Sequence, residues 1–202
     1  MDRRSHWEVV HGTQQPDQLS WFQARAGTSV ELITESAPDP TVGILDVGAG
    51  ASPLSAELAS VGCEAVTVMD LALGALTDEG AGARDVRRVV GDALHAPFAD
   101  RSFGVWHDRA AFHFFTAPAD RDRYVGQVRR ILCPGGTLIV ATFAVDGPIR
   151  CSGLPVARYA PDDLQRAFGD GFVPVTFRRE IHRTPSGTIQ PFTWSVFRRG
   201  PD

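Results

Sequence analysis

The sequence predicts an α/β fold with a doubly wound sheet of seven strands, mostly parallel, and an antiparallel hairpin strand at the C-terminus. Three observations lead to this prediction. From residue 41 onward, short apolar runs alternate with segments of helical periodicity, which is typical of parallel sheets. Residues 44–58, "ILDVGAGASPLSAEL", have the pattern of a strand, a glycine turn and a helix. Near the C-terminus, two segments of alternating polarity flank "TPSG", as in a β-hairpin.

The individual elements follow from their end signals as well as from periodicity. Pro38 and Pro40 end a first helix before the first strand. Ser52 is expected to be the N-cap of the next helix, with Pro53 at its first helical position. "PGG" at 134–136 closes the long amphipathic helix and opens the fifth strand. The expected strands are 42–47, 64–70, 86–92, 103–108, 137–145, 171–183 and 188–199, and the expected helices are 27–36, 52–62, 72–83, 118–132 and 160–169.

Length and composition indicate one domain. The 202 residues suffice for a single core, with residues 1–40 as an N-terminal cap or lid and 41–202 as the core. The net charge of −4 argues against a nucleic acid as partner. The sequence has no signal-peptide pattern and no run of about 18 apolar residues. We therefore expect a cytoplasmic protein without a membrane partner, as a monomer or a homodimer.

The cysteines predict neither a disulfide framework nor a metal centre. Cys63, Cys133 and Cys151 are odd in number and far apart in the chain. They form no C-x-x-C pair, which zinc sites and redox motifs commonly contain. We expect three reduced thiols and no metal.

Polar and small residues gather where the predicted strands end, which is where open α/β sheets bind their ligands. Strand 1 is followed by a glycine turn whose two glycines can take positive φ and let a ligand approach the backbone. Asp70 ends strand 2, where a carboxylate can accept hydrogen bonds from both hydroxyls of a ribose. Asp92 and Ala93 end strand 3, in a position to meet an adenine edge.

The residues of the glycine turn also indicate which class of nucleotide it can bind. The dinucleotide fingerprint G-x-G-x-x-G would place Gly48, Gly50 and Pro53 at its three glycine positions, and proline fits the third poorly. A phosphate-binding loop requires G-K-[ST], and no lysine follows the turn. NAD and ATP are thus disfavoured, and a nucleoside without phosphates remains.

Four motifs in the expected order give a more specific result. "ILDVGAGA" ends strand 1, "VTVMDL" ends strand 2, "VVGDA" ends strand 3, and "LCPGGTLIV" precedes strand 5. Together they resemble the class I S-adenosylmethionine-dependent methyltransferases over roughly residues 41–200, which implies a Rossmann-like fold. A narrower, local resemblance of "SHWEVV…SWF" and "WHDRAAFHF" is to a small bacterial branch that includes lysine methyltransferases and thiopurine-methyltransferase-like proteins.

The resemblance implies S-adenosyl-L-methionine as cofactor, with S-adenosyl-L-homocysteine as product. Gly48 and Gly50 would lie against the methionine part, and Asp70 would hold the ribose. Asp92 and Ala93 would meet the adenine. The full set of expected cofactor-binding residues is Asp46, Gly48, Ala49, Gly50, Asp70, Leu71, Asp92, Ala93 and Trp21.

The candidate catalytic residues are Asp108, His107 and His113. Methyl transfer needs close alignment of the acceptor, and it needs a base only when the acceptor is protonated. Asp108 and His107 sit at the end of strand 4 on opposite faces, so one of them faces the site. Asp108 either orients a ligand or forms an ion pair with Arg109. His113 is either a base or a packed core histidine.

Substrate contacts are expected from two regions. In the N-terminal segment, aromatic residues either cap the cofactor and line the pocket or merely pack. After strand 5, a loop lies where pockets in this fold are often built. The candidate substrate-binding residues are Trp7, His11, Phe22, Arg109, Arg150 and Tyr159.

Three functions fit these motifs. The first is methyl transfer to an O, N or S nucleophile of a small molecule, which the compact size and the aromatic N-terminal segment favour. The second is a protein (lysine) methyltransferase, which an open, acidic rim would favour. The third is a non-catalytic S-adenosylmethionine-binding regulatory module, which has no need of Asp70 and Asp92 together.

Overall fold

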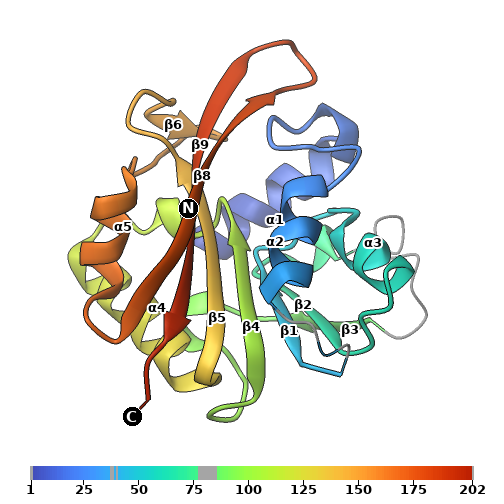
Figure 1. The fold of residues 1–202 in the computed structure, drawn as a ribbon. Coiled ribbons are helices and arrows are strands. Elements are labelled where there is room, and N and C mark those ends of the chain that lie inside the picture. The colour runs from blue at the N-terminus through green and yellow to red at the C-terminus, as the bar shows by residue number, and fades with distance from the viewer. Residues whose placement is uncertain (1, 37–38, 40, 77–85, 202) are drawn as a thin grey trace.

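The computed structural model describes residues 2–36, 39, 41–76 and 86–201, and it confirms the predicted α/β class. Within these residues one sheet has seven strands in the order β3-β2-β1-β4-β5-β9-β8 (Figure 1). Its strands are β1 Ile44–Val47, β2 Val66–Asp70, β3 Arg87–Val90, β4 Phe103–Arg109, β5 Leu132–Phe143, β8 Phe172–Arg183 and β9 Ile189–Arg199.

Strand direction follows the prediction. Strands β1 to β5 are parallel to one another, β9 is antiparallel to β5, and β8 is antiparallel to β9. The chain first moves outward from β1 to β3 and then crosses to β4 on the other side of β1. The strand order therefore reverses between β1 and β4, and a ligand site is expected at the carboxyl ends there.

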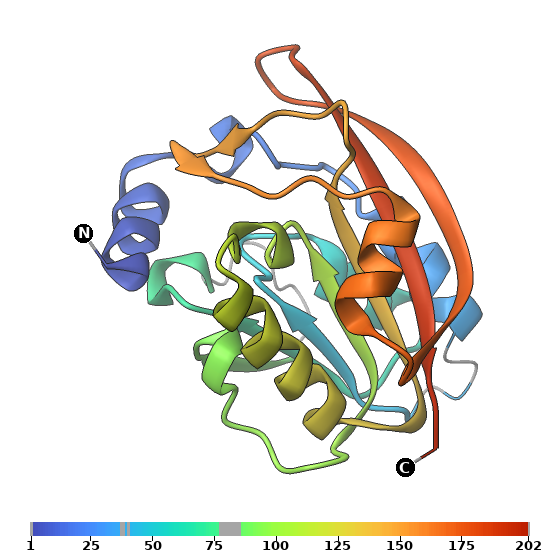
Figure 2. The same ribbon diagram turned by 90° about the vertical axis from the view of Figure 1, so that its left-hand side faces the viewer.

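Helices cover both faces of the sheet (Figures 1 and 2). Helices α2 and α3 pack on one face, and α4 and α5 pack on the other. The helices are α1 Arg3–Thr13, α2 Gly27–Ser36, α3 Leu54–Ser60, α4 Pro118–Ile131 and α5 Pro161–Phe168, and short 3-10 turns are η1 Pro16–Gln18, η2 Leu73–Ala75, η4 Ala93–His95 and η5 Phe112–Phe114.

The core explains why β4 has a continuous apolar run. Val105 packs into the cluster under α2 and α3, and its neighbour Trp106 packs into the cluster under α4 and α5. Successive side chains of a strand point to opposite faces, so a strand covered on both faces is apolar at successive positions wherever its side chains lack polar partners. Each fully buried side chain of this kind contributes about 1.5–3 kcal/mol of transfer free energy.

Several elements differ from the expectation. Helix α1 and the small hairpin of β6 (Arg150–Cys151) and β7 (Leu154–Pro155) are not predicted by the sequence patterns. The predicted helix at 72–83 is the turn η2 as far as residue 76, and residues 77–83 lie outside the described residues. Strand β5 begins at Leu132 and so includes "PGG", because residue 132 already pairs with β4.

The start of α3 also differs by a residue or two. The helix begins at Leu54, after Pro53, rather than at Pro53. Ser52 still satisfies a free donor of the first turn, because its Oγ accepts a hydrogen bond from the Leu54 N–H at 3.2 Å.

Among the residues that the structure describes, no helix has the length and apolar character of a membrane span.

Candidate functional site

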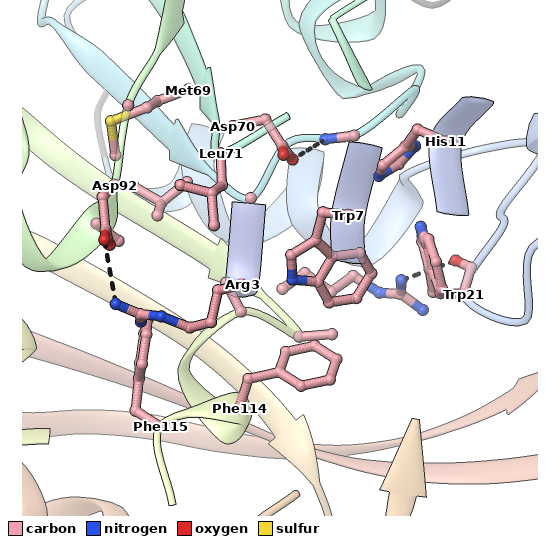
Figure 3. A pocket seen from close by; sticks show the side chains of 18 of the residues that line it. Arg3, Trp7, His11, Trp21, Met69, Asp70, Leu71, Asp92, Phe114 and Phe115 are labelled. Atoms are coloured by element: carbon pink, nitrogen blue, oxygen red, sulfur yellow. Dashed lines mark hydrogen bonds and ion pairs between the residues drawn. The ribbon is translucent and has the colours of Figure 1, made fainter. Parts of the chain in front are cut away.

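A cavity lies at the carboxyl ends of β1, β2, β3 and β4, at the reversal of strand order (Figure 3). We call it the strand-end cavity. Its lining is mainly apolar and comes from the strand ends, from α1 and from the segments that follow β4 and β5. The lining residues are Arg3, Trp7, His11, Trp21, Val47, Gly48, Gly50, Met69, Asp70, Leu71, Gly91, Asp92, Ala93, Arg109, Ala110, Ala111, Phe114, Phe115 and Cys151.

The glycine turn after β1 forms one wall. Gly48 and Gly50 have φ values of 67° and 55°, in the left-handed region that favours glycine. A Cβ on Gly48 would lie 2.8 Å from the Cβ of Ala111, so the turn and the segment after β4 approach closely only because Gly48 lacks a side chain. The backbone of the turn is thus open to the cavity.

Asp70 is held in place by the same turn. Its Oδ2 accepts a hydrogen bond from the Gly50 N–H, and its Oδ1 accepts one from the Ala72 N–H, both at 3.0 Å. Burial raises the pKa of Asp70, and the two backbone donors and nearby His11 act in the opposite direction. The carboxylate is therefore positioned at the cavity wall before any ligand is present.

Asp92 borders the cavity on the side of β3. Its Oδ1 accepts a hydrogen bond from the Leu94 N–H at 2.9 Å, which orders the turn η4. Its Oδ2 pairs with Arg3 of α1 at 3.1 Å, an ion pair that Figure 3 shows from the N-terminal helix to the end of β3. An exposed pair of this kind is weak, so it holds α1 only lightly.

Helix α1 contributes Arg3, Trp7 and His11 to the lining of the cavity. Glu8 accepts hydrogen bonds from the N–H groups of Leu73 and Gly74, at 2.8 and 3.4 Å, and so ties α1 to η2. Trp7 packs edge-on against Phe114 and Trp21, with ring centroids 5.0 and 5.8 Å apart. The N-terminal segment forms part of the cavity wall as well as packing on itself.

His11 completes this aromatic wall. Its ring lies 6.0 Å from the ring of Trp21, and burial lowers its pKa against the opposing charges of Asp70 and Glu8. The imidazole is therefore more strongly biased toward its neutral form at neutral pH than an exposed histidine.

A second cavity lies on the other side of the glycine turn, under the segment that joins η1 to α2. We call it the turn cavity. It shares Trp21, Gly48 and Arg109 with the strand-end cavity. Its other lining residues are Pro16, Leu19, Phe22, Gln23, Ser29, Asp46, Ala49, Ala51, Ser52, Pro53 and His107.

The structure separates the three candidate catalytic residues from the strand-end cavity. His107 lies between Asp46 and Ser29: its Nδ1 is 2.7 Å from Asp46 Oδ1 and its Nε2 is 3.0 Å from Ser29 Oγ. This buried chain ties β1 and β4 to α2. His107 and Asp46 line the turn cavity instead.

Asp108 points to the opposite face of the sheet, as strand alternation requires. Its carboxylate accepts hydrogen bonds from the Tyr124 hydroxyl at 2.5 Å and from the Ala111 N–H at 2.8 Å. Burial raises its pKa to about 6 against these donors. It does not pair with Arg109, so neither expectation for Asp108 matches its contacts.

His113 is fully buried between the rings of Phe114 and Phe143. Burial, together with the charge of Arg109, lowers its pKa to about 3, so it stays neutral. This placement matches the packed alternative. Two substrate candidates also lie outside both cavities: Tyr159 packs on Phe112, and exposed Arg150 donates to the Gly153 carbonyl.

The remaining sequence candidates do converge. Ten of them line the strand-end cavity: Trp7, His11, Trp21, Gly48, Gly50, Asp70, Leu71, Asp92, Ala93 and Arg109. Phe22 and Ala49 line the turn cavity with Asp46 and His107. Sequence reasoning missed Arg3, Glu8, Phe114 and Phe115, whose roles depend on where α1 docks and on the turn η5 after β4.

Within the described ranges, no three His, Cys, Asp or Glu side chains converge to hold a metal ion.

The comparisons with known proteins agree with this geometry. A family model described as "Methyltransferase domain" matches residues 45–140, which carry the glycine turn, Asp70 and Asp92. Demethylmenaquinone methyltransferase of Mycolicibacterium vanbaalenii is 34% identical over 106 residues, 52% of this chain and 43% of that protein. Both matches support the resemblance to the class I S-adenosylmethionine-dependent methyltransferases. The cofactor of this family is S-adenosylmethionine.

Two further similar proteins extend the comparison. Malonyl-[acyl-carrier protein] O-methyltransferase of Methylococcus capsulatus is 30% identical over 132 residues, 63% of this chain and 46% of that protein. The solved structure of Burkholderia thailandensis 1,6-didemethyltoxoflavin-N1-methyltransferase, with bound 1,6-didemethyltoxoflavin and S-adenosylhomocysteine, shares the fold. Its TM-score is 0.74 at 19% identity, over 98% of this chain and 87% of that one.

These relatives also limit which properties can be transferred to this chain by similarity. The matches cover less than half of the length of the two curated relatives. None of the three is named as a lysine or thiopurine methyltransferase. The local similarity at the end of strand 4 therefore gains no support from them.

Proposed function

We propose that this chain transfers a methyl group from S-adenosylmethionine to an O, N or S atom of a small molecule. One observation carries the proposal. A single cavity unites the glycine turn after β1, the carboxylate at the end of β2 and the carboxylate at the end of β3. Glycines with positive φ, a pre-positioned acceptor for ribose hydroxyls and an adjacent polar edge suit an adenosine without phosphates.

In this proposal each wall has a separate role. The carboxylate of Asp70 accepts hydrogen bonds from the ribose hydroxyls in place of some of those from backbone N–H groups. The backbone of Gly48 and Gly50 lies against the methionine part. Asp92 and Ala93 border the adenine. The bound cofactor supplies an electrophilic methyl group on a positively charged sulfur, which the faces of Trp7 and Trp21 suit through cation–π attraction.

We assign no proton transfer to Asp108 or His113, because their contacts keep both out of the strand-end cavity. His11 is an imidazole that does line that cavity, and its lowered pKa favours the neutral form that can accept a proton. The main contribution of the protein is then alignment of acceptor and methyl group.

The form of the cavity favours a small acceptor over a protein. Helix α1 forms part of its wall, and aromatic rings rather than an acidic rim form much of the rest. An extended peptide would need an open groove beside the methyl group. The relatives named above also act on small molecules or on a carrier-bound acyl group by name.

Two experiments test the proposal. Calorimetry with S-adenosylhomocysteine is expected to show binding to the purified protein. An extract incubated with the protein and methyl-labelled S-adenosylmethionine is expected to gain label in its small-molecule fraction. Label in the protein fraction alone would support the lysine methyltransferase alternative, and cofactor binding without any transfer would support a regulatory module.

A further inference from the structure

Arg109 occupies the junction between the two cavities. It is the last residue of β4, and it lines both cavities together with Trp21 and Gly48. The next residue, Ala110, has a φ of 72°, which is unusual for a residue with a side chain. Such a conformation is strained and persists only where the surroundings fix it. The chain thus turns sharply at the point where Arg109 enters the junction.

The guanidinium of Arg109 is only partly satisfied. Its Nη1 donates a hydrogen bond to the Trp21 carbonyl at 3.0 Å, and its Cζ lies 4.7 Å from the ring centroid of Phe192. Nε and Nη2 are closed to solvent and have no hydrogen-bond partner in the described structure. These two nitrogens form one edge of the planar group, the edge that binds a carboxylate with two parallel hydrogen bonds.

The neighbouring acidic groups are already engaged elsewhere. Asp46 pairs with His107, and Glu180 accepts hydrogen bonds from Gln23 and from the indole of Trp194. Asp108 faces the other side of the sheet. In the described part of the chain, then, no carboxylate hydrogen-bonds to Arg109, and Glu180 and Asp46 favour its charge only from a longer distance. Leaving two N–H groups closed to solvent without a hydrogen-bond partner is costly.

We propose that Arg109 is an anchor for a ligand carboxylate, bound on its Nε–Nη2 edge at the junction of the two cavities. The inference rests on the proposed function, because two ligands can bring that group. One is the cofactor, through its methionine carboxylate, and the other is the methyl acceptor. Both atoms are closed to solvent in this conformation, so a neighbouring side chain must shift before a ligand can reach them.

The first arm of the test isolates the cofactor carboxylate. Binding of S-adenosylhomocysteine is compared by calorimetry with binding of S-adenosyl-3-thiopropylamine, which lacks only the carboxylate. If the cofactor supplies the group, Arg109→Met weakens S-adenosylhomocysteine by about 10- to 100-fold and leaves the thiopropylamine unchanged. Arg109→Lys keeps the positive charge but lacks the paired N–H donors of a guanidinium, and it is expected to lose part of that affinity.

The second arm isolates a carboxylate on the acceptor. Benzoate and neutral benzamide are titrated into the protein, with and without S-adenosylhomocysteine, while the Arg109 Nε–H resonance is followed by NMR. If the acceptor supplies the group, benzoate shifts this resonance, benzamide does not, and the cofactor affinity of Arg109→Met stays within about twofold of the wild type.

Controls separate this idea from a fold defect and from the proposed function. Arg129 also lies over a phenylalanine ring, at 6.0 Å from that of Phe172, but it lines neither cavity. Arg129→Met is expected to bind both ligands normally. The proposal is overturned if Arg109→Met binds S-adenosylhomocysteine normally and benzoate causes no shift that benzamide does not. Failure of the wild type to bind S-adenosylhomocysteine would count against the proposed function, whereas the benzoate arm needs no cofactor.

Discussion

His113 is expected to make the fold sensitive to acid, and His113→Asn should remove that sensitivity. The pKa of His113 is lowered from 6.5 to about 3 by burial, so the folded state resists a proton that the unfolded chain accepts. The contribution of neutral His113 to the free energy of unfolding is fully present above pH 6.5 and is lost as the pH falls toward 3. With these two values, lowering the pH from 7 to 5 costs the wild type about 2 kcal/mol through this one group.

Asp108 acts in the opposite direction over the same range. Its pKa is raised from 3.8 to about 6, so the folded state gains a proton more readily than the unfolded chain. Its contribution to stability is fully present below pH 3.8 and is lost as the pH rises through 6. Between pH 7 and 5 it offsets roughly 1 kcal/mol of the loss from His113. The pH dependence of the wild type alone is therefore a poor test, and a variant is needed.

The assay is urea unfolding, followed by tryptophan fluorescence, at pH 7 and at pH 5. Asparagine keeps an acceptor near the Phe143 N–H, which lies 3.5 Å from His113 Nδ1, and it does not titrate. The difference in unfolding free energy between variant and wild type should move by about 2 kcal/mol in favour of the variant at pH 5. The exposed His95→Asn serves as the control. Equal differences at both pH values would refute the reasoning.

Three further substitutions test the strand-end cavity. Asp70→Asn should weaken S-adenosylhomocysteine at least about tenfold by calorimetry, because an amide offers one acceptor where the ribose needs two; unchanged affinity would remove Asp70 from the ribose site. Gly48→Ala should lower the unfolding free energy by about 2 kcal/mol more than Gly62→Ala, because both have positive φ but only Gly48 has a close neighbour; equal losses in urea unfolding would contradict this. Trp7→Ala should lower cofactor affinity about tenfold with little change in thermal unfolding, and an unchanged affinity would reduce α1 to packing.

Most of the sheet could be predicted because its signals are local. A strand buried on both faces is mostly apolar, and the glycines, prolines and caps that end each element lie within a few residues of it. Helix α1 gave no such signal. It is mostly polar, and it is held by Glu8 on the N–H groups of η2, 65 residues away. A contact of that range cannot be read from periodicity.

The cofactor residues and the catalytic candidates differ in the same way. Gly48, Gly50 and Asp70 follow their strands directly, so topology alone brings them together. Alternation along β4 correctly places His107 and Asp108 on opposite faces, but their partners decide whether either is free. Asp46 and Tyr124 engage them from other elements, 61 and 16 residues away.

The end of β4 shows how a structure separates such residues. His107, Asp108 and Arg109 are consecutive and all polar in the interior of a sheet, where unpaired polar groups are costly. The first two find partners within the protein, so their burial is explained by the fold. Arg109 keeps two unpaired nitrogens beside two cavities, so the fold alone leaves the burial of these two atoms unexplained. A ligand that brings a carboxylate would supply the missing partner, and this is why Arg109, rather than its two neighbours, is the polar residue of β4 to which we assign a ligand.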